Sequence, residues 1–590
     1  MTTSSRVARL MRTARTVRNL RLSQVAWRLI RTGQRRFEQP SKPSTGNGLS
    51  LNLEAARRHL DRLPIDESAE RPAAIDSDGE LRLLGQPWPL FDARTGTIEW
   101  RLGPVRSGRL QTITLHYHDW FEPLAKAAAG GDTEAATMLR RMWADWLARC
   151  PLDADGSRDL AWNAYAIATR VIAWFRCLAT LPDSFWTDEL PRQQVVASLF
   201  DQGRFLVRHV EWDVRGNHLL RDGVGLLWLA SGLAATDRDA MREIAKWQRL
   251  GERIVEAEVP HQQFGDGLHY ERSLHYHFEF LRDLLAIHAT WPQPFVSDAL
   301  ALGVEEPETL RHPDGRSCHF GDGQAEWPAD VLAAAASVSG ASPSGTYCRT
   351  EFALSRFQAV YVARWALFQT FGPPGPREQP GHAHDDCTAI ELSLDDRRLI
   401  VDPGTYDYDD GPRRRHDRSA AAHNAVCYDG QNRNEFWHIF RLGRRAPAAS
   451  IEGGWPFTSD GGSWTANRRT PHAGQRDART ITIDTASVSI VDRIVTAGGA
   501  TSAAVSFLIP APWVVDRDHE ASNRWIASCE DAAVAITFRG PSTLQTDASD
   551  ASHAPRYLVD EPATRMRWRL PLHDITTPIE VAVRFEIVLR

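Results

Sequence analysis

The sequence predicts an α+β protein, with a helical N-terminal part followed by an antiparallel β part. Between about Leu115 and Trp291, apolar residues recur at three- and four-residue spacing, which is the period of an α-helix. After Tyr347 the apolar period falls to two, which is the period of a strand with one buried face. A chain of 590 residues is also too long for one hydrophobic core. We therefore expect at least two domains, with a boundary near residue 345.

Residues 1–100 are predicted to be a basic N-terminal segment and a lead-in to the helical domain. Residues 1–40 carry ten Arg and one acid, Glu38, and the Arg residues interrupt every apolar run, so we recognise no secretory signal. An amphipathic helix on an anionic surface is one interpretation. Its apolar side would be Val17, Leu20, Val25 and Leu29. The interpretation we favour is a helix that packs on the following domain.

Residues 101–345 form the predicted helical domain. The helical period is clearest in four segments, at 161–178, 194–210, 218–234 and 273–289. Short connections separate them, which leaves a bundle, a solenoid or an α/α toroid open, because no fixed-period repeat decides between them. Residues 303–345 are rich in Gly, Pro, Ser and Ala and predict a linker with some local structure.

Residues 346–590 form the predicted β domain. Apolar residues alternate with polar ones around 390–394 and 566–570. In the last segment one apolar face is formed by Ile579, Val581, Val583, Phe585, Ile587 and Leu589. Strict alternation of this kind predicts antiparallel sheet packed on one side.

The composition excludes several classes of protein. The net charge of −6 gives no reason to expect a nucleic-acid partner. Seven Cys without a CxxC pair argue against a disulfide framework or a thiolate zinc site. No run of about eighteen apolar residues occurs, so no transmembrane helix is expected. The 21 Trp fit a sugar-binding cleft or a large helical core equally well.

The first polar cluster is the sequence RGNHLL at 215–220. Gly216 allows a tight turn, and Asn217 is suited to cap the helix that follows. The side chains of Asn217 and His218 would then lie at a helix N-terminus, whose free N–H groups and partial positive charge favour a bound carboxylate. A simple cap and a carboxylate site both fit this pattern.

The second cluster, DGLHYERSLHYH at 266–277, holds more titratable groups than a helix cap requires. Ser273 alone would suffice as the cap. Tyr270 is a candidate proton donor or acceptor, provided that nearby positive charge lowers its pKa. Aromatic residues that wedge helices together are an equally good explanation.

The third cluster, GHAHDD at 381–386, precedes a strand, and Asp402 and His423 follow further along the chain. Two His and one Asp, with another His nearby, are ligands that suit Zn²⁺. Asp402 reaches His384 only if the loop before the strand folds back.

A fourth stretch, at 434–445, mixes aromatic and basic residues and includes Trp437. It fits contact with an anionic sugar chain or a strand with a solvated basic end.

These blocks together resemble the heparinase II/III family of polysaccharide lyases, which includes proteins related to heparinase II, heparinase III and oligoalginate lyases. The blocks are LHYHDWF at 115–121, RGNHLLRDGVGLLWL at 215–229, DGLHYERSLHYH at 266–277, GHAHDDCTAIELSLDDRRLIVDPGTY at 381–406 and RSAAAHNAVCYDGQNRNEFW at 418–437. Their order and spacing are more specific than any single block. The resemblance implies an N-terminal incomplete α/α toroid followed by a C-terminal antiparallel β-sandwich.

The family reaction is β-elimination in an acidic, uronic-acid-containing polysaccharide bound between the two domains, which leaves a 4,5-unsaturated uronate end. By resemblance, Asn217 and His382 bind the uronate carboxylate and Tyr270 is the acid. On suitably configured substrates Tyr270 is also a candidate for the base. If the base is separate, His218 is the first choice, and Tyr276 and His277 are secondary candidates. We also expect substrate-binding roles for Tyr276, His277, Arg272 and Trp437.

The resemblance also implies one structural Zn²⁺ at the cleft, held by His384, Asp402 and His423. It implies a bacterial envelope or periplasmic location, with the cytoplasm as the alternative because no signal peptide is recognised. We expect a monomer or homodimer, with peripheral membrane contact through the basic N-terminus left open.

Two other functions compete with the lyase. A glycoside hydrolase on an α/α toroid needs two catalytic carboxylates across the bond. Its candidates are Glu211, Asp213, Asp266 and Glu271. A non-catalytic polysaccharide-binding or assembly protein is also open, since fold does not fix function. A zinc hydrolase is weaker, because no HExxH motif accompanies the His and Asp set.

Overall fold

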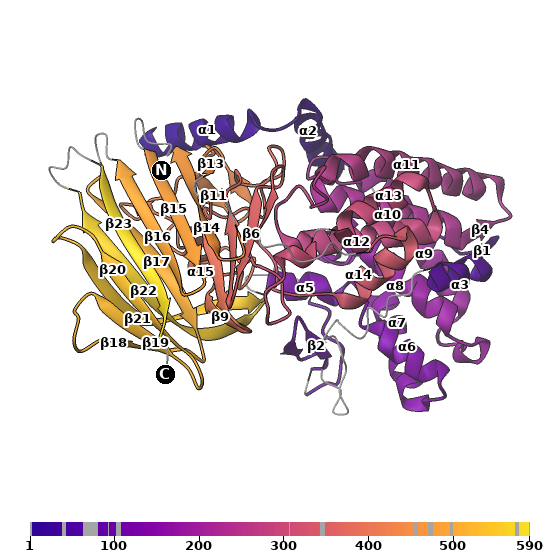
Figure 1. Cartoon of the computed structure of the whole chain (residues 1–590). Coiled ribbons are helices and arrows are strands. Elements are labelled where there is room, and N and C mark those ends of the chain that lie inside the picture. The colour runs from indigo at the N-terminus through magenta and orange to yellow at the C-terminus, as the bar shows by residue number, and fades with distance from the viewer. Residues whose placement is uncertain are drawn as a thin grey trace.

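The structure is a computed structural model of the whole chain, with a helical half and a sheet half in contact (Figure 1). It describes residues 3–37, 43–62, 81–92, 94–101, 108–305, 307–342, 349–453, 458–469, 476–495, 500–572 and 578–588. The helical half precedes the sheet half in the chain, as the sequence predicts. The predicted boundary near residue 345 lies outside the described residues, as does Leu589.

The helical half contains most of the α-helices. They are α3 (Leu53–Arg62), α5 (Arg109–Leu115), α6 (Phe121–Ala129), α7 (Thr133–Arg149), α8 (Ala164–Thr180), α9 (Arg192–His209), α10 (Gly216–Gly232), α11 (Arg238–Gln262), α12 (Leu274–Thr290), α13 (Pro294–Glu305) and α14 (Ala329–Ser339). The long buried helix α10 lies at the centre and packs against α8, α9, α11 and α12. Side-chain caps begin several of these helices, since Asp132, Asn163 and Asp237 accept hydrogen bonds from backbone N–H groups of α7, α8 and α11.

Tryptophan fills the interior of this half. The almost fully buried Trp side chains of the described chain are Trp100, Trp120, Trp143, Trp146, Trp174, Trp228, Trp247, Trp365, Trp464 and Trp568. Seven of them belong to the helical core. The Trp content therefore reflects packing, because burying a large aromatic ring contributes much of a core's stability.

The lead-in to the helical domain is part of its core. Strand β1 (Leu49–Leu51) pairs with β4 (Leu233–Ala235), directly after α10. The hairpin of β2 (Leu81–Leu83) and β3 (Gln86–Trp88) buries its leucines in the same core. The described residues between 49 and 101 thus fold with the helices.

The sheet half contains antiparallel sheets around one shared core. A five-stranded sheet is formed by β5 (Arg349–Phe352), β6 (Phe357–Val362), β7 (Trp365–Thr370), β8 (Ile390–Leu394) and β9 (Arg397–Ile400). An eight-stranded sheet is formed, in spatial order, by β13 (Ser450–Gly453), β14 (Gly461–Arg469), β15 (Arg476–Asp484), β16 (Ser487–Val495), β23 (Ile579–Ile587), β20 (Ala533–Arg539), β19 (Arg524–Ser528) and β18 (Val514–Arg517). A four-stranded sheet is formed by β10 (Cys427–Tyr428), β17 (Ser502–Pro510), β22 (Val559–Pro571) and β21 (Gln545–Arg556).

The predicted alternation is clearest in β23. Its residues Ile579, Val581, Val583 and Phe585 are buried, and the residues between them are exposed or half-buried. Strand β8 differs from the prediction, because all of its residues are buried. Its second face packs toward the helical half, where the Glu391 carboxylate accepts a hydrogen bond from His312 at 2.9 Å. A polar residue in an alternating strand can therefore face another domain instead of solvent.

The stretch 303–345, predicted to be a linker, is largely structured and packed. It includes the end of α13, the whole of α14 and a loop whose residue Asp322 is fully buried. The prediction of a linker with some local structure understated the order of the described residues here, because small residues also occur in close-packed segments. Here they allow close packing.

Two basic helices, α1 (Thr3–Val17) and α2 (Leu22–Phe37), follow one another at one edge of the molecule and join the two halves (Figure 1). We call this pair the N-terminal hairpin, although the two helices do not pack along each other. Arg15 in α1 pairs with Glu435 of the sheet half at 2.6 Å, and Arg31 in α2 pairs with Asp213 of the helical half at 3.1 Å. The favoured interpretation, packing on the protein, agrees with these contacts. None of the helices in the described ranges combines the length and apolar character of a bilayer-spanning segment.

Candidate active site

A cleft of about 560 Å³ lies between the helical half and the loops of the sheet half. Its walls come from α5, α8, α10 and α12 on one side, and from residues 378–382 and 440–445 on the other. Tyrosines, and no Trp, line its described surface. These are Tyr117, Tyr165, Tyr276, Tyr408 and Tyr557.

The start of α10 presents Asn217 and His218 to the cleft. The preceding residues, Arg215 and Gly216, have positive φ angles of 66° and 64°, which turn the chain sharply into the helix. A Cβ on Gly216 would lie 2.8 Å from Glu271 Oε1, so only Gly fits there. The side-chain oxygen of Asn217 is buried and has no hydrogen-bond partner among the described residues. The Asn217 side chain lies at the positive end of a helix, where its Nδ2 group can donate to a bound carboxylate.

His218 is paired with a buried carboxylate. Its Nδ1 lies 2.9 Å from Glu211 Oε2, and its ring packs against Tyr165. Burial alone would lower the pKa of His218, but the Glu211 carboxylate outweighs burial and raises that pKa above its ordinary value. The pairing at Nδ1 leaves Nε2 as the ring nitrogen that can meet a substrate.

His382 and Tyr276 face each other in the cleft wall. Their rings are stacked, with centroids 3.9 Å apart and an interplanar angle of 9°. His382 Nδ1 is hydrogen-bonded to the fully buried carboxylate of Glu271. Burial would raise the pKa of Glu271, but the nearby His382 lowers it. The carboxylate fixes the orientation of the imidazole that the cleft presents.

The hydroxyl of Tyr276 belongs to a chain of three phenols. It lies 3.0 Å from the hydroxyl of Tyr408, which lies 2.9 Å from that of Tyr557. Burial raises the pKa of Tyr276 well above the ordinary value for a phenol. Tyr276 therefore carries its proton at neutral pH, and it lines the cleft.

Tyr270 does not line the cleft. Its ring contacts those of His261 and His269 edge-on, and its buried hydroxyl has no hydrogen-bond partner among the described residues. Burial raises its pKa, as it does that of Tyr276, so the lowering by positive charge that the prediction required is found at neither tyrosine. The structure favours Tyr276 over Tyr270 as the acid by position alone, because Tyr276 is the tyrosine of this motif that lines the cleft.

Three of the predicted substrate-binding residues also lie elsewhere. His277 Nε2 contacts the Gly303 carbonyl at 2.9 Å, and burial lowers the pKa of His277 to about 3. Arg272 donates from Nε to the Ser355 carbonyl at 3.1 Å. Trp437 donates from Nε1 to Thr16 Oγ1 at 3.1 Å and so holds the N-terminal hairpin. None of the three is among the residues that line the cleft.

Six arginines are among the residues that line the cleft. They are Arg28, Arg109, Arg221, Arg282, Arg441 and Arg445. Arg221 and Arg282 share the carboxylate of Glu279, at 3.2 and 2.9 Å. Burial and the neighbouring Arg377 lower the pKa of Arg445 to about 10, so it keeps its charge at neutral pH.

Two family models match the two halves of the chain. Residues 79–298 match "Heparinase II/III N-terminus", and residues 346–582 match "Heparinase II/III-like, C-terminal". The chain belongs to the heparinase II/III family. The order of these matches follows the helical and sheet halves of the fold.

Among curated relatives, the chain is similar to two proteins named heparin-sulfate lyase. It is 22% identical to that of Bacteroides stercoris over 397 residues, which are 58% of this chain and 58% of the relative. It is 26% identical to that of Bacteroides thetaiotaomicron over 196 residues, which are 33% of this chain and 27% of the relative. The chain thus spans less than two thirds of the length of each.

Solved structures share the fold over nearly the whole chain. A crystal structure of heparinase III superposes with a TM-score of 0.69 at 16% identity, covering 94% of this chain and 88% of that one. The heparinase III product of gene BT4657 gives a TM-score of 0.59 at 16% identity, with coverage of 94% and 88%. At this level of identity the likeness establishes the fold.

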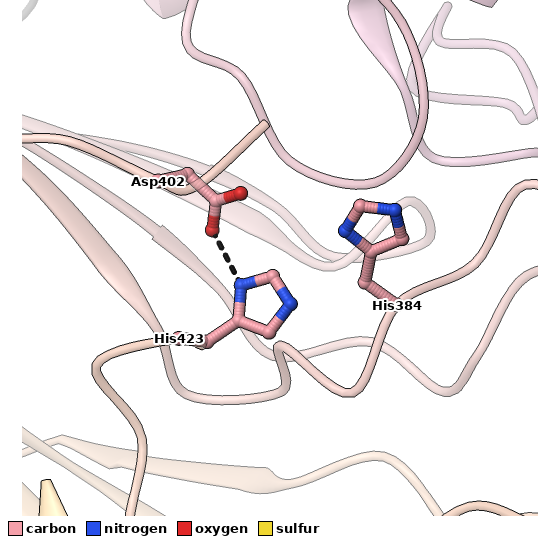
Figure 2. A group of neighbouring side chains, drawn as sticks. All are labelled: His384, Asp402 and His423. Carbon is pink, nitrogen blue, oxygen red and sulfur yellow. Dashed lines mark hydrogen bonds and ion pairs between the residues drawn. The ribbon is translucent and has the colours of Figure 1, made fainter. Parts of the chain in front are cut away.

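The three predicted metal ligands of this heparinase II/III family member lie together. One ligand atom each from His384, Asp402 and His423 lie within 4.8 Å of one another (Figure 2). His423 Nδ1 contacts Asp402 Oδ2 at 2.7 Å. The other ring nitrogen of His423, and Nδ1 of His384, are buried without hydrogen-bond partners among the described residues. Unsatisfied imidazole nitrogens beside a carboxylate fit a Zn²⁺ ion.

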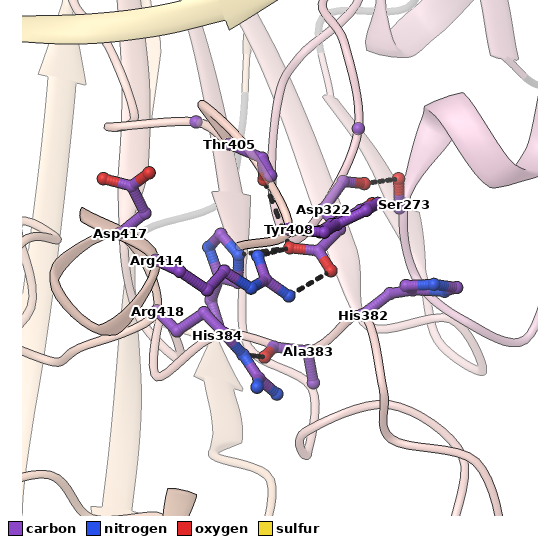
Figure 3. Close-up of polar contacts among 12 residues, drawn as sticks. Ser273, Asp322, His382, Ala383, His384, Thr405, Tyr408, Arg414, Asp417 and Arg418 are labelled. Atoms are coloured by element: carbon purple, nitrogen blue, oxygen red, sulfur yellow. Dashed lines mark hydrogen bonds and ion pairs between the residues drawn. The ribbon is translucent and has the colours of Figure 1, made fainter. Parts of the chain in front are cut away.

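A buried ion pair, which no local sequence pattern indicates, connects this triad to the helical half. Asp322 forms an ion pair with Arg414 of α15 (Pro412–Asp417) and contacts His384 Nε2 at 2.8 Å (Figure 3). Burial would raise the pKa of Asp322, but Arg414 holds it far below its ordinary value. A carboxylate on the outer nitrogen of a histidine orients that ring, as around many metal sites.

Proposed function

We propose that this chain is a polysaccharide lyase that cleaves a uronic-acid-containing polymer by β-elimination. The observation that carries the proposal is the meeting of Asn217, His218, Tyr276 and His382 in one cleft between the two halves. Elimination needs three kinds of group, and these four residues supply them: a partner for the carboxylate, a base for the C5 proton and an acid for the leaving oxygen. We infer also that the halves are the incomplete α/α toroid and β-sandwich that the family resemblance implies.

Asn217 and His382 are proposed to bind the uronate carboxylate. The proton on C5 becomes acidic only when charge that builds on the carboxylate is stabilised. The Asn217 amide lies at the positive end of α10, and His382 is oriented by buried Glu271. Both features favour the enolate-like transition state over the substrate.

His218 is proposed to remove the C5 proton through Nε2, while Tyr276 protonates the departing O4. The electron pair of the C5–H bond forms the C4–C5 double bond, and the C4–O4 bond breaks. The Glu211 carboxylate makes the His218 ring more basic, which supports its role as acceptor. The high pKa of Tyr276 keeps its proton in place until O4 develops negative charge.

A polyanionic substrate is supported by the arginines that frame the cleft. Arg28, Arg441 and Arg445 lie at the rim formed by the hairpin and the sheet half. A guanidinium binds carboxylate or sulfate groups through two parallel hydrogen bonds. The tyrosine rings supply apolar faces on which pyranose rings can lie.

One Zn²⁺ is proposed for His384, Asp402 and His423. When bound, the ion would link three loops of the sheet half behind the cleft and stiffen them. The triad lies next to His382 in sequence and contacts Asp322 of the helical half. The role is therefore structural, and the elimination itself uses the side chains of the cleft.

A hydrolase is less well supported, because the nominated carboxylates are occupied. Glu211 pairs with His218, Glu271 with His382 and Asp213 with Arg31, while Asp266 accepts hydrogen bonds from the loop at Leu354.

Product masses test the choice between elimination and hydrolysis. Elimination adds no water, so the two fragments of each cut together have the mass of the uncut chain, and one of them is lighter by one water than its hydrolysis counterpart. Fragments that together gain one water per cut would establish hydrolysis, and intact polymer that stays bound would indicate a binding protein.

A further inference from the structure

The N-terminal hairpin carries most of the exposed apolar surface of the described chain. Of the eleven large apolar side chains exposed there, eight lie in α1 and α2. These are Val7, Leu10, Met11, Val17, Leu22, Leu29, Ile30 and Phe37. Apolar side chains concentrated in this way mark an interaction surface, whereas isolated ones need no explanation.

In α1 these side chains form one stripe on the side away from the protein. Positions 7, 10, 11, 14 and 17 follow the three- and four-residue spacing of a helix face, and all are exposed. The opposite side of α1 packs on the protein. Thr16 is buried there, and its hydroxyl donates a hydrogen bond to the Leu442 carbonyl at 3.0 Å. A helix that packs only on its own domain would turn its apolar stripe inward.

In α2 the arrangement is repeated. Leu22 is 89% exposed and Leu29 is 71% exposed, and Phe37 continues the same outward stripe at 77%. The opposite side of α2 contacts the protein through polar groups. There, buried Gln24 donates hydrogen bonds to the backbone carbonyls of Asp213 and Glu378. Both helices lie at one edge of the molecule (Figure 1), and the apolar side chains of both stripes are exposed.

The charge of the hairpin identifies the partner. Residues 1–37 contain ten Arg and no Asp or Glu. Arg9, Arg18 and Arg36 are exposed in this segment. We propose that the hairpin binds the surface of an anionic lipid bilayer, with the apolar stripes in the acyl boundary and the arginines at the headgroups.

Two other partners fit less well. A second copy of this chain would bring two strongly cationic hairpins together, which their charges oppose. An acidic polysaccharide would satisfy the arginines but leave Leu22 and Phe37 in water.

The hairpin also contributes to the cleft. Thr16, Leu20 and Arg28 line it, and Arg15 and Arg31 hold the hairpin to both halves. A bilayer bound to the hairpin would therefore lie beside the cleft and bring the cleft to polymer at the membrane surface.

Vesicle flotation of the full chain tests the proposal. The probes are vesicles of phosphatidylcholine alone and vesicles of roughly equal parts phosphatidylcholine and phosphatidylglycerol. We expect binding to the anionic vesicles only, weakened by added salt. The double variant Leu22→Ser/Leu29→Ser should bind at least about tenfold more weakly, because it removes two side chains from the acyl boundary.

The matched control is Met241→Ser/Leu354→Ser, which removes exposed apolar side chains outside the hairpin. It should float like the unmodified protein, and thermal melting should be the same for all three. No flotation with anionic vesicles would overturn the proposal. The proposal would also be overturned if the Leu22→Ser/Leu29→Ser variant still bound the anionic vesicles and lost only self-association or only polysaccharide binding.

Discussion

At the scale of single residues, the surroundings of each titratable group decide its chemistry. Tyr270 and Tyr276 come from one sequence motif, and burial raises the pKa of both. Only the Tyr276 hydroxyl lies in the cleft and belongs to a hydrogen-bonded chain. The sequence identifies the motif but not which tyrosine turns inward, because that depends on where α12 begins.

The rate of elimination is expected to rise with pH as His218 loses its proton. The pKa of this histidine lies above 6.5, since the Glu211 carboxylate outweighs burial, so the acidic limb should lie above that value. In Glu211→Gln the carboxylate that raises the pKa of His218 is lost and the burial that lowers it remains, so the limb should move to lower pH. The measurement is kcat/KM against pH for both proteins.

A rate that rises as pH falls would contradict this account of His218. The imidazolium would then act as a cation beside the substrate carboxylate, and the base would have to be another group. If the acidic limb of the pH profile did not move in Glu211→Gln, the limb would reflect the titration of a residue other than His218.

At the scale of elements, the entry to α10 links local geometry to the cleft. Gly216→Ala should lower the free energy of unfolding by about 1–3 kcal/mol, because φ is 64° and the new Cβ would lie 2.8 Å from Glu271 Oε1. Turnover should also fall, since Glu271 orients His382. Urea unfolding and steady-state rates measure the two effects.

The control for this variant is Gly33→Ala in α2, where a Cβ meets nothing within 4 Å. It should be neutral or slightly stabilising, because Ala favours a helix over Gly. Equal effects of the two substitutions would show that the Gly216 turn carries no special constraint.

Periodicity identified the elements whose burial is one-sided or strongly patterned. The predicted helices at 161–178, 194–210, 218–234 and 273–289 correspond to α8, α9, α10 and α12 within a few residues. Helix α14 was missed, because the sequence ADVLAAAASVS has little polar contrast to reveal a period. The two-sided burial of β8 was missed for a related reason, since Glu391 looks like a solvent-facing residue until its domain partner is known.

At the scale of the whole molecule, the site depends on contacts between the halves. The predicted metal triad was found by residue type, and the loop that brings His384 to Asp402 does fold back. Glu211, Glu271 and Asp322 were not assigned their observed contacts, because an acid has no local pattern that names a partner far away in sequence. The partners of residues outside short motifs therefore became known only from the tertiary structure.

Zinc should be retained by the purified protein at about one ion per chain. The expected effect of a chelator is a loss of about 3 kcal/mol of stability and a Tm lower by a few degrees. His423→Ala should lose both the metal and the chelator effect. Metal analysis and thermal melting measure this, and a metal-free protein whose Tm ignores added Zn²⁺ would remove the basis for the site.

The most direct test of the central claim is ultraviolet absorbance of the 4,5-unsaturated uronate on heparan-, alginate- and hyaluronan-type polymers. The unmodified protein should produce a rise on at least one polymer, and Tyr276→Phe should slow it by about 10²–10⁴. Tyr270→Phe should keep nearly the full rate, because the hydroxyl it removes is buried and unpaired. Loss of the rise in Tyr270→Phe but not in Tyr276→Phe would contradict the assignment. Reducing ends without any rise would contradict elimination itself.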